Sequence, residues 1–90
     1  MEITFDTVKR NKTLKERDLD FADCGTVFQG KHLTVEDTRE DYPEPRFQTM
    51  GWLAERIVMV VWTPRGKGRR IISMRKANER EIAKVKNILD

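Results

Sequence analysis

Residues 46–75 read RFQTMGWLAERIVMVVWTPRGKGRRIISMR, and this stretch holds three apolar-rich runs separated by short links. The runs cover residues 46–53, 56–63 and 69–75. The middle run contains IVMVVW, which is apolar at every position, as expected for a central strand buried on both faces. The AE link and the PRGKG segment both fit tight turns, since Pro and Gly favour turn conformations. The stretch therefore predicts three antiparallel strands of one sheet.

The residues before this stretch predict two helices and two short strands. Residues 2–5 alternate between polar and apolar side chains, as a short strand does. Asp6 is a helix cap, since its carboxylate can accept hydrogen bonds from free backbone N–H groups, and the helix extends to about Arg17. Asp20 caps a second helix that ends near residues 29–30. HLTVED then predicts a strand at residues 32–35, followed by an acidic loop that contains two prolines.

The residues after this stretch predict a C-terminal helix that packs on the sheet. Asn78 with Glu81 three positions later resembles a capping box. Four apolar residues then share one helical stripe: Ile82, Val85, Ile88 and Leu89. The fold class predicted for residues 1–90 is therefore α+β, in one domain, because this length does not accommodate two.

Charge is strongly segregated along the chain although the net charge is only +3. Residues 9–17 hold five cations and one acid, and residues 36–44 hold five acids and one cation, Arg39. Residues 65–76 hold six cations and no acid. This pattern favours a polyanion as partner. The alternative is that the arginines pair with the acidic loop, where surface ion pairs contribute about 0–1 kcal/mol each.

Several classes of protein are disfavoured by the composition. No stretch approaches the roughly 18 apolar residues that a membrane span needs. The first residues, MEITFD, lack the basic start and apolar run of a secretion signal, so we expect a cytoplasmic protein that does not contact membranes. Cys24 and His32 are the only residues of their types, so we expect no internal disulfide, no metal site and no cofactor. Cys24 is interpreted as a core residue.

The last predicted strand carries arginines on both of its faces. Simple alternation groups residues 71, 73 and 75 on one face and residues 70, 72 and 74 on the other. At least one arginine then projects from the face that the helices do not cover. An arginine side chain offers a planar fork that fits two phosphate oxygens and keeps its charge. Trp52 shares a strand face with Arg46, so it is the aromatic residue predicted to stack on a base.

Five stretches carry a resemblance to a known family: DTVKRNKTLKERDLDFAD, TVF, EPRFQTMGWL, VVWTPRG and RRIISMRKANERE. Together they resemble the BrnT family of type II toxin–antitoxin ribonucleases over nearly the whole chain, and the last stretch is the most specific. The resemblance implies a RelE-like fold, with N-terminal helices, a twisted antiparallel sheet of about four strands and a C-terminal helix. One departure is that many members carry Lys-His-Gly where this chain has Glu16, Arg17 and Asp18.

The resemblance implies a toxin that cleaves RNA and halts translation. It also implies a cognate antitoxin that neutralises the toxin, forms a hetero-oligomer with it and binds operator DNA, so that this chain contacts DNA only through its partner. A non-catalytic RNA-binding module or a protein-interaction domain that uses the same basic surface remains the alternative.

A ribonuclease without metal lets the RNA 2′-OH attack the adjacent phosphodiester, and the enzyme holds the phosphate, stabilises negative charge and moves protons. The residues predicted to be catalytic are Arg46, Arg65, Arg75 and Lys9. Those predicted to bind RNA are Arg70, Lys12 and Trp52. The general base stays open among Lys9, His32, Glu55 and Glu81, and Lys9 is preferred because it matches the family pattern.

Overall fold

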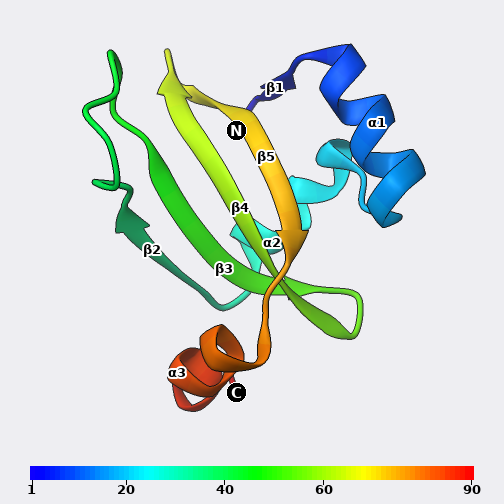
Figure 1. Cartoon of the computed structure of the whole chain (residues 1–90), viewed down its shortest axis with the longest axis vertical. Coiled ribbons are helices and arrows are strands. Elements are labelled where there is room, and N and C mark those ends of the chain that lie inside the picture. The colour runs from blue at the N-terminus through cyan, green and yellow to red at the C-terminus, as the bar shows by residue number, and fades with distance from the viewer.

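The computed structural model describes residues 1–90 and shows a five-stranded sheet with three α-helices (Figure 1). The elements in chain order are β1 (Ile3–Phe5), α1 (Thr7–Arg17), the 3₁₀ turn η1 (Phe21–Asp23), α2 (Cys24–Gln29), β2 (His32–Glu36), β3 (Phe47–Leu53), β4 (Arg56–Arg65), β5 (Gly68–Lys76) and α3 (Glu79–Leu89). The α+β class is confirmed. None of the helices is long and apolar enough to cross a membrane.

The sheet is mixed, with strand order β1-β5-β4-β3-β2, so the expected antiparallel sheet of about four strands is wrong in detail. β1 precedes the helices and pairs parallel with β5, while the other neighbours are antiparallel. β1 covers the outer edge of β5, where the backbone N–H of Arg69 donates to the carbonyl of Glu2 at 2.8 Å. This pairing also packs Ile3 and Phe5 against the core, which favours it although β1 is short.

The three-stranded meander is confirmed, with Ala54 and Glu55 as the link between β3 and β4. Pro64 was expected in the next turn, but β4 continues through it to Arg65. β3 begins opposite Trp62, so β4 has a partner on only one side at Pro64. A proline, which lacks the N–H, is tolerated at such an edge position.

The predicted alternation along β5 is wrong because a β-bulge interrupts it. Trp62 pairs with Ile71 and Val61 pairs with Ser73, so Ile72 has no partner on β4. A bulge adds one residue to the strand, so every side chain after it points to the face opposite to the one that simple alternation predicts. Ile71 and Met74 are consequently both buried in the core, which strict alternation forbids.

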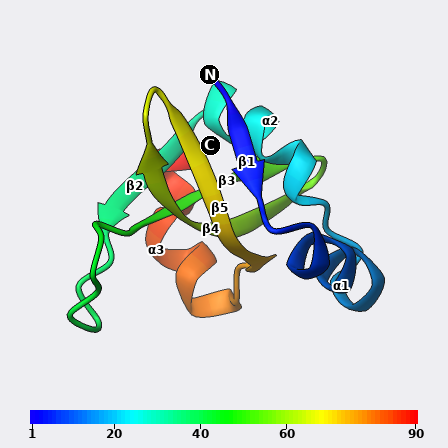
Figure 2. The same ribbon diagram turned by 90° about the horizontal axis from the view of Figure 1, so that it is seen from above.

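The two faces of the sheet are covered differently. Figure 2 shows α2 on one side of the sheet, and α1, α3 and the loop of residues 37–46 projecting on the other. The main core lies on the α2 side and joins residues of η1 and α2 to β4 and β5: Leu19, Phe21, Cys24, Val27, Phe28, Val58, Val60, Trp62, Ile71 and Met74. On the other side, α3 packs around Ile57 with Val85 and Leu89, and the β4 residues Met59, Val61 and Thr63 of that face are buried as well.

The caps of α1 and α3 follow the local sequence, but the Asp20 carboxylate caps the 3₁₀ turn η1, and α2 begins only at Cys24 without a side-chain cap. The Asp6 carboxylate accepts a hydrogen bond from the Lys9 backbone N–H at 3.1 Å, and Asn78 with Glu81 forms the predicted capping box. α1 ends at Asp18, which has a left-handed φ of 57°. Asp tolerates this conformation better than most residues other than Gly and Asn.

Candidate functional site

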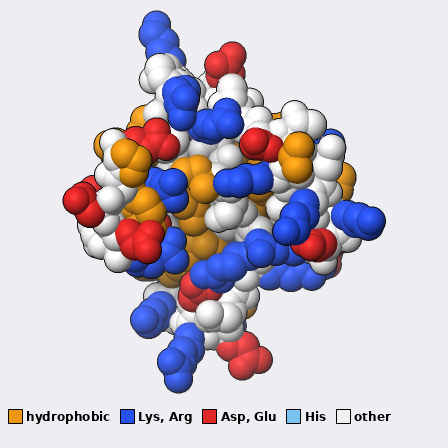
Figure 3. Space-filling view, turned by 45° about the horizontal axis from the view of Figure 1, so that its top comes forward, with side chains coloured by type: hydrophobic (Ala, Val, Ile, Leu, Met, Phe, Trp, Pro, Cys, Tyr) orange, Lys and Arg blue, Asp and Glu red, His pale blue; other side chains and the backbone are white.

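The side of the sheet opposite α2 carries a basic surface that we call the open face. Its floor consists of the β4 residues Met59, Val61 and Thr63 and their β5 partners Arg75, Ser73 and Arg70. Directly opposed residues of an antiparallel pair share a face, and the bulge at Ile72 brings the two arginines and Ser73 onto the same one. Figure 3 shows Lys and Arg side chains gathered around apolar side chains on this side of the molecule. α1, α3 and the 37–46 loop rise around this floor.

Arg75 is held on the open face by Glu81 of α3. Its guanidinium donates two hydrogen bonds to the two carboxylate oxygens, at 2.7 and 2.8 Å. These bonds hold the pKa of Glu81 at about 2 and raise the pKa of Arg75. Glu81 is thus a fixed anion that orients Arg75 and is too weakly basic to serve as a good general base. The Arg75 side chain remains 42% exposed, so it can still bind a ligand.

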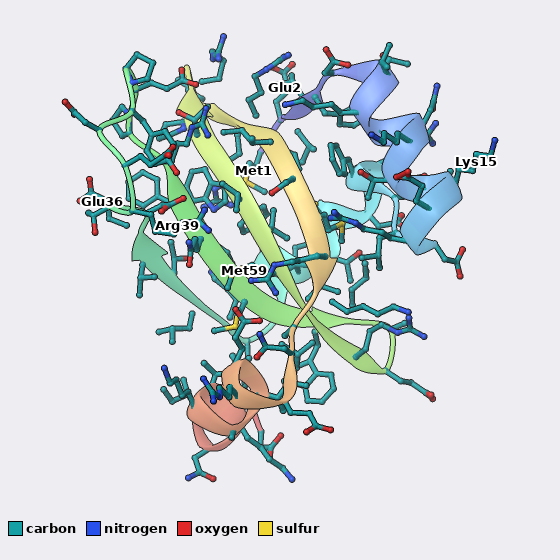
Figure 4. All side chains as sticks on the ribbon, viewed as in Figure 1. Met1, Glu2, Lys15, Glu36, Arg39 and Met59 are labelled. Carbon is teal, nitrogen blue, oxygen red and sulfur yellow. The ribbon has the colours of Figure 1, made fainter.

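Arg39 faces the same area and is held in the same way by Asp37. The Arg39 guanidinium donates to both oxygens of the buried Asp37 carboxylate at 2.7 Å, and the pKa of Asp37 falls to about 2. The hydrogen bonds to Glu81 raise the pKa of Arg75, and the positive charge of Arg39 acts in the opposite direction, so Arg39 lies within electrostatic range of Arg75. Figure 4 shows Arg39 over β3, on the side of the view toward β2. The open face therefore carries two cationic forks, each oriented by its own carboxylate.

Sequence reasoning did not identify Arg39 as a site residue. The signal that was available is its position as the only cation among the five acids of residues 36–44. That signal does not place the side chain over the sheet, because the placement depends on how the loop folds back on β3. The backbone N–H of Asp37 donates to the carbonyl of Arg46 at 2.8 Å, which closes the loop.

Arg46 lies at the closed base of this loop and stacks on Tyr42. Its guanidinium carbon is 4.2 Å from the centre of the Tyr42 ring. The Arg46 Nε is buried and has no hydrogen-bond partner.

Arg65 lies far from Arg75, at the opposite end of the hairpin. Arg65 pairs with Gly68 at the start of β5, and Arg75 is near its end. At about 3.3 Å per residue the two arginines are separated by roughly 20 Å, which is too far to hold one phosphate. Arg65 also forms an ion pair with Glu44 of the acidic loop at 3.5 Å, as the alternative interpretation of the arginines expected. Arg75 does not pair with that loop.

Lys9 and Lys12 of α1 border the open face from the side. They line a groove between α1 and β5 together with Arg17, Ile72 and Ser73. Arg17 closes one end of this groove by donating to the Met74 carbonyl at 2.7 Å. The structure therefore brings the two predicted lysines to the edge of the strand that carries Arg70 and Arg75.

Trp52 and His32 are both engaged away from the arginine pair. The Trp52 indole N–H donates to the carbonyl of Leu89 at 3.0 Å, so this side chain supports the end of α3. His32 pairs with Gly51, and a side chain at position 51 would point toward Val27 of α2. The centre of the His32 ring lies 6.0 Å from the centre of the Phe28 ring. His32 is thus on the covered side of the sheet, where it does not reach the open face.

Arg69 also lies on the covered side. Its guanidinium carbon is 4.1 Å from the ring centre of Phe28 and 4.6 Å from that of Trp62. Cation–π contacts of this kind stabilise a partly desolvated arginine. Of the three β5 arginines, Arg70 and Arg75 are therefore available to a ligand on the open face, and Arg69 supports the core.

Comparison with known proteins identifies the family of the chain. No curated protein matches the sequence. A family model described as the ribonuclease toxin BrnT of a type II toxin–antitoxin system matches residues 5–81. The match includes the whole of β2 to β5, the loop that carries Arg39 and the Glu81 that orients Arg75. The chain therefore belongs to the BrnT family of ribonuclease toxins of type II toxin–antitoxin systems.

Proposed function

We propose that this chain is an endoribonuclease that cleaves RNA on the open face without a metal ion. The observation that carries the proposal is the pair Arg75 and Arg39, two cationic forks on one surface, each oriented by a carboxylate. In the reaction, a ribose 2′-OH attacks the adjacent phosphorus, a cyclic phosphate forms and the 5′-oxygen of the next nucleotide leaves. Negative charge grows on the phosphate oxygens, and donors that are already oriented stabilise it without having to rearrange.

Each residue of the open face has a distinct role in this proposal. Arg75 binds the non-bridging oxygens of the reacting phosphate and Arg39 assists it, because guanidinium forks fit two oxygens at once. Glu81 and Asp37 are positioning residues for these arginines. Lys9, across the groove from Ser73, remains the preferred side chain for moving protons. Lys12, Arg70, Arg46 and Arg65 contact neighbouring phosphates along the strand, in keeping with the RelE-like architecture that the resemblance implies.

An RNA cleavage assay tests this proposal with a matched pair of variants. Arg75→Ala removes the guanidinium group that Glu81 orients. We expect cleavage to fall by about 10²–10³-fold, as for the loss of one oriented donor to a developing oxyanion. Arg80→Ala is the control, because Arg80 is an exposed arginine of α3 only a few residues away. Wild-type cleavage should persist in EDTA and should stop when the reacting nucleotide is 2′-deoxy.

The same assay separates the alternatives. An RNA complex without cleavage identifies a non-catalytic RNA-binding module, and neither binding nor cleavage identifies an interaction protein. Loss of cleavage in EDTA with recovery on adding magnesium contradicts the metal-free mechanism. Full activity of Arg75→Ala contradicts the assignment of the site.

We also propose that a DNA-binding antitoxin covers the open face, forms a hetero-oligomer with this chain and stops it from arresting translation in the cytoplasm. A type II toxin family supports this partner, as do the cations of the open face, Arg70 and Arg75 with Lys9 and Lys12 at its edge, which attract any RNA. Operator DNA is then bound by the complex and not by this chain alone. Co-expression with the neighbouring small open reading frame, followed by purification through a tag on this chain, should recover both proteins. Recovery of the intact chain alone from cells that grow normally contradicts the proposal.

A further inference from the structure

We propose that Tyr42 is the platform on which one nucleobase of the bound RNA stacks, beside the arginine pair that holds the phosphate. This inference rests on the proposed function of the open face. It adds a base-binding position that the phosphate contacts by themselves do not supply, since arginine forks bind every nucleotide through the same phosphate group.

The Tyr42 ring lies outside the protein core and is only partly covered. Tyr42 is the only tyrosine of the chain, and it belongs to neither hydrophobic cluster. One face of its ring carries the Arg46 guanidinium, at 4.2 Å. No other aromatic ring or cation stacks on it. The ring also lines the open hollow of residues 36–46, where a ligand can reach it, and a flat nucleobase is the part of RNA that stacks on an aromatic ring.

Tyr42 also lies close to the proposed phosphate site. Tyr42 lines the same open hollow as Arg39, whose guanidinium is held by its two hydrogen bonds to Asp37. Arg39 in turn lies close enough to Arg75 to influence its pKa. A base on the Tyr42 ring would thus lie in the same hollow as Arg39, one arginine of the pair. This spacing fits a nucleotide adjacent to the reacting phosphate.

The loop that carries Tyr42 is held in shape before any ligand binds. The Asp37–Arg46 backbone hydrogen bond closes it, and the Thr63 hydroxyl donates to the Pro45 carbonyl at 2.6 Å. Pro43 and Pro45 restrict the backbone further. A platform of this kind loses little conformational entropy on binding, so the stacking energy contributes to affinity.

The hollow beside Tyr42 suits a base better than a phosphate. Residues 36–46 line an open hollow, and its acidic members outnumber Arg39 and Arg46. Exposed carboxylates repel a phosphate, but they accept hydrogen bonds from the amino groups of bases. The RNA backbone therefore follows the arginines and lysines of β5 and α1, while a base turns toward the loop.

Abasic scanning of an RNA oligonucleotide tests this inference. Each RNA carries a 2′-deoxy residue at the cleavage position, which prevents cleavage, and a single abasic residue at a different position in each member of the series. For the wild-type protein we expect one position near the cleavage site at which loss of the base weakens binding by about tenfold. Tyr42→Leu should bind intact RNA about tenfold more weakly and should be insensitive to base loss at that one position.

Two further variants serve as controls. Tyr42→Phe keeps the ring and should keep the sensitivity to base loss. Trp52→Leu removes a more exposed aromatic side chain, and it too should keep the sensitivity because Trp52 supports α3. Partial unfolding of any variant weakens binding to every RNA of the series equally, so an effect confined to one position separates stacking from damage to the fold.

The outcomes that overturn this inference differ from those that overturn the proposed function. If Tyr42→Leu keeps the full sensitivity to base loss while Arg75→Ala abolishes cleavage, the site stands and Tyr42 is not its platform. If Trp52→Leu loses the sensitivity instead, Trp52 is the platform. If the wild-type protein binds no RNA, both this inference and the proposed function are wrong.

Discussion

The Glu81 carboxylate accepts two hydrogen bonds from Arg75, at 2.7 and 2.8 Å, and a third from the backbone N–H of Asn78, at 2.9 Å. One side chain thus completes the capping box of α3 and orients the arginine at the end of β5. The first turn of the helix and the candidate site are therefore coupled. A change at Glu81 acts on both, and the two effects can be measured separately.

Glu81→Gln should reduce RNA cleavage by roughly 10–100-fold, which is less than Arg75→Ala, because the arginine is still present but is no longer held in place. The amide can still accept from the Asn78 backbone, so the helix should persist and stability should fall by at most about 1 kcal/mol. Cleavage rates and thermal melting check the two parts. Glu79→Gln, which removes an exposed acid from the same turn, is the control. Equal activity of the two variants would contradict a positioning role for Glu81.

Acid should destabilise the protein through Glu81 and Asp37. The pKa of each carboxyl group is lowered in the folded state to about 2, from 4.5 for Glu81 and 3.8 for Asp37. The stabilisation is therefore fully present above about pH 4.5 and is lost as the pH falls toward 2. Urea unfolding across this range should show a smaller loss of stability for the double variant Glu81→Gln, Asp37→Asn than for the wild type. Parallel curves for the two proteins would mean that these carboxyl groups do not control the acid response.

Arg75→Ala and Arg65→Ala should both relieve growth arrest in cells that express the toxin. The effect should be larger for Arg75, since Arg65 lies at the far end of the hairpin and contacts only the flanking RNA in our proposal. Both ion pairs are partly exposed, so the melting temperature should change little. Growth curves and thermal melting of the purified variants provide the measurement. Variants that melt many degrees lower would show that these arginines are structural.

Gly51→Ala should destabilise the fold by about 1–3 kcal/mol, because an added methyl group has no room. A Cβ at this position would lie 2.8 Å from a Val27 methyl group and 3.1 Å from the His32 Cβ. Gly25→Ala is the matched control, since nothing lies within 4 Å of its added Cβ and Ala favours a helix. Chemical unfolding of the two variants should show a loss for Gly51→Ala and no loss for Gly25→Ala. Equal stabilities would imply that α2 shifts away from β3 without cost.

Local sequence determined the elements of this protein. The meander of residues 46–75 follows from the period of its side chains and the breaks between its runs, and the α3 cap follows from Asn78 and Glu81. These signals act between residues close in the chain, so they need no knowledge of the rest of the fold. The arginine-rich β5 and its likeness to a ribonuclease toxin family were visible for the same reason, because both lie in continuous stretches of sequence.

Tertiary structure decided which of these side chains meet. The bulge at Ile72 arises from the pairing of β5 with β4 and not from β5 itself, and it reverses the faces that alternation predicts. The parallel pairing of β1 depends on a free edge that only the assembled sheet provides. Arg39 reaches the open face because its loop folds back on β3, and Arg65 is kept from Arg75 by the length of the hairpin. Strand periodicity is a local property, whereas register and loop closure depend on contacts between residues far apart in the chain, and these contacts place the arginine pair.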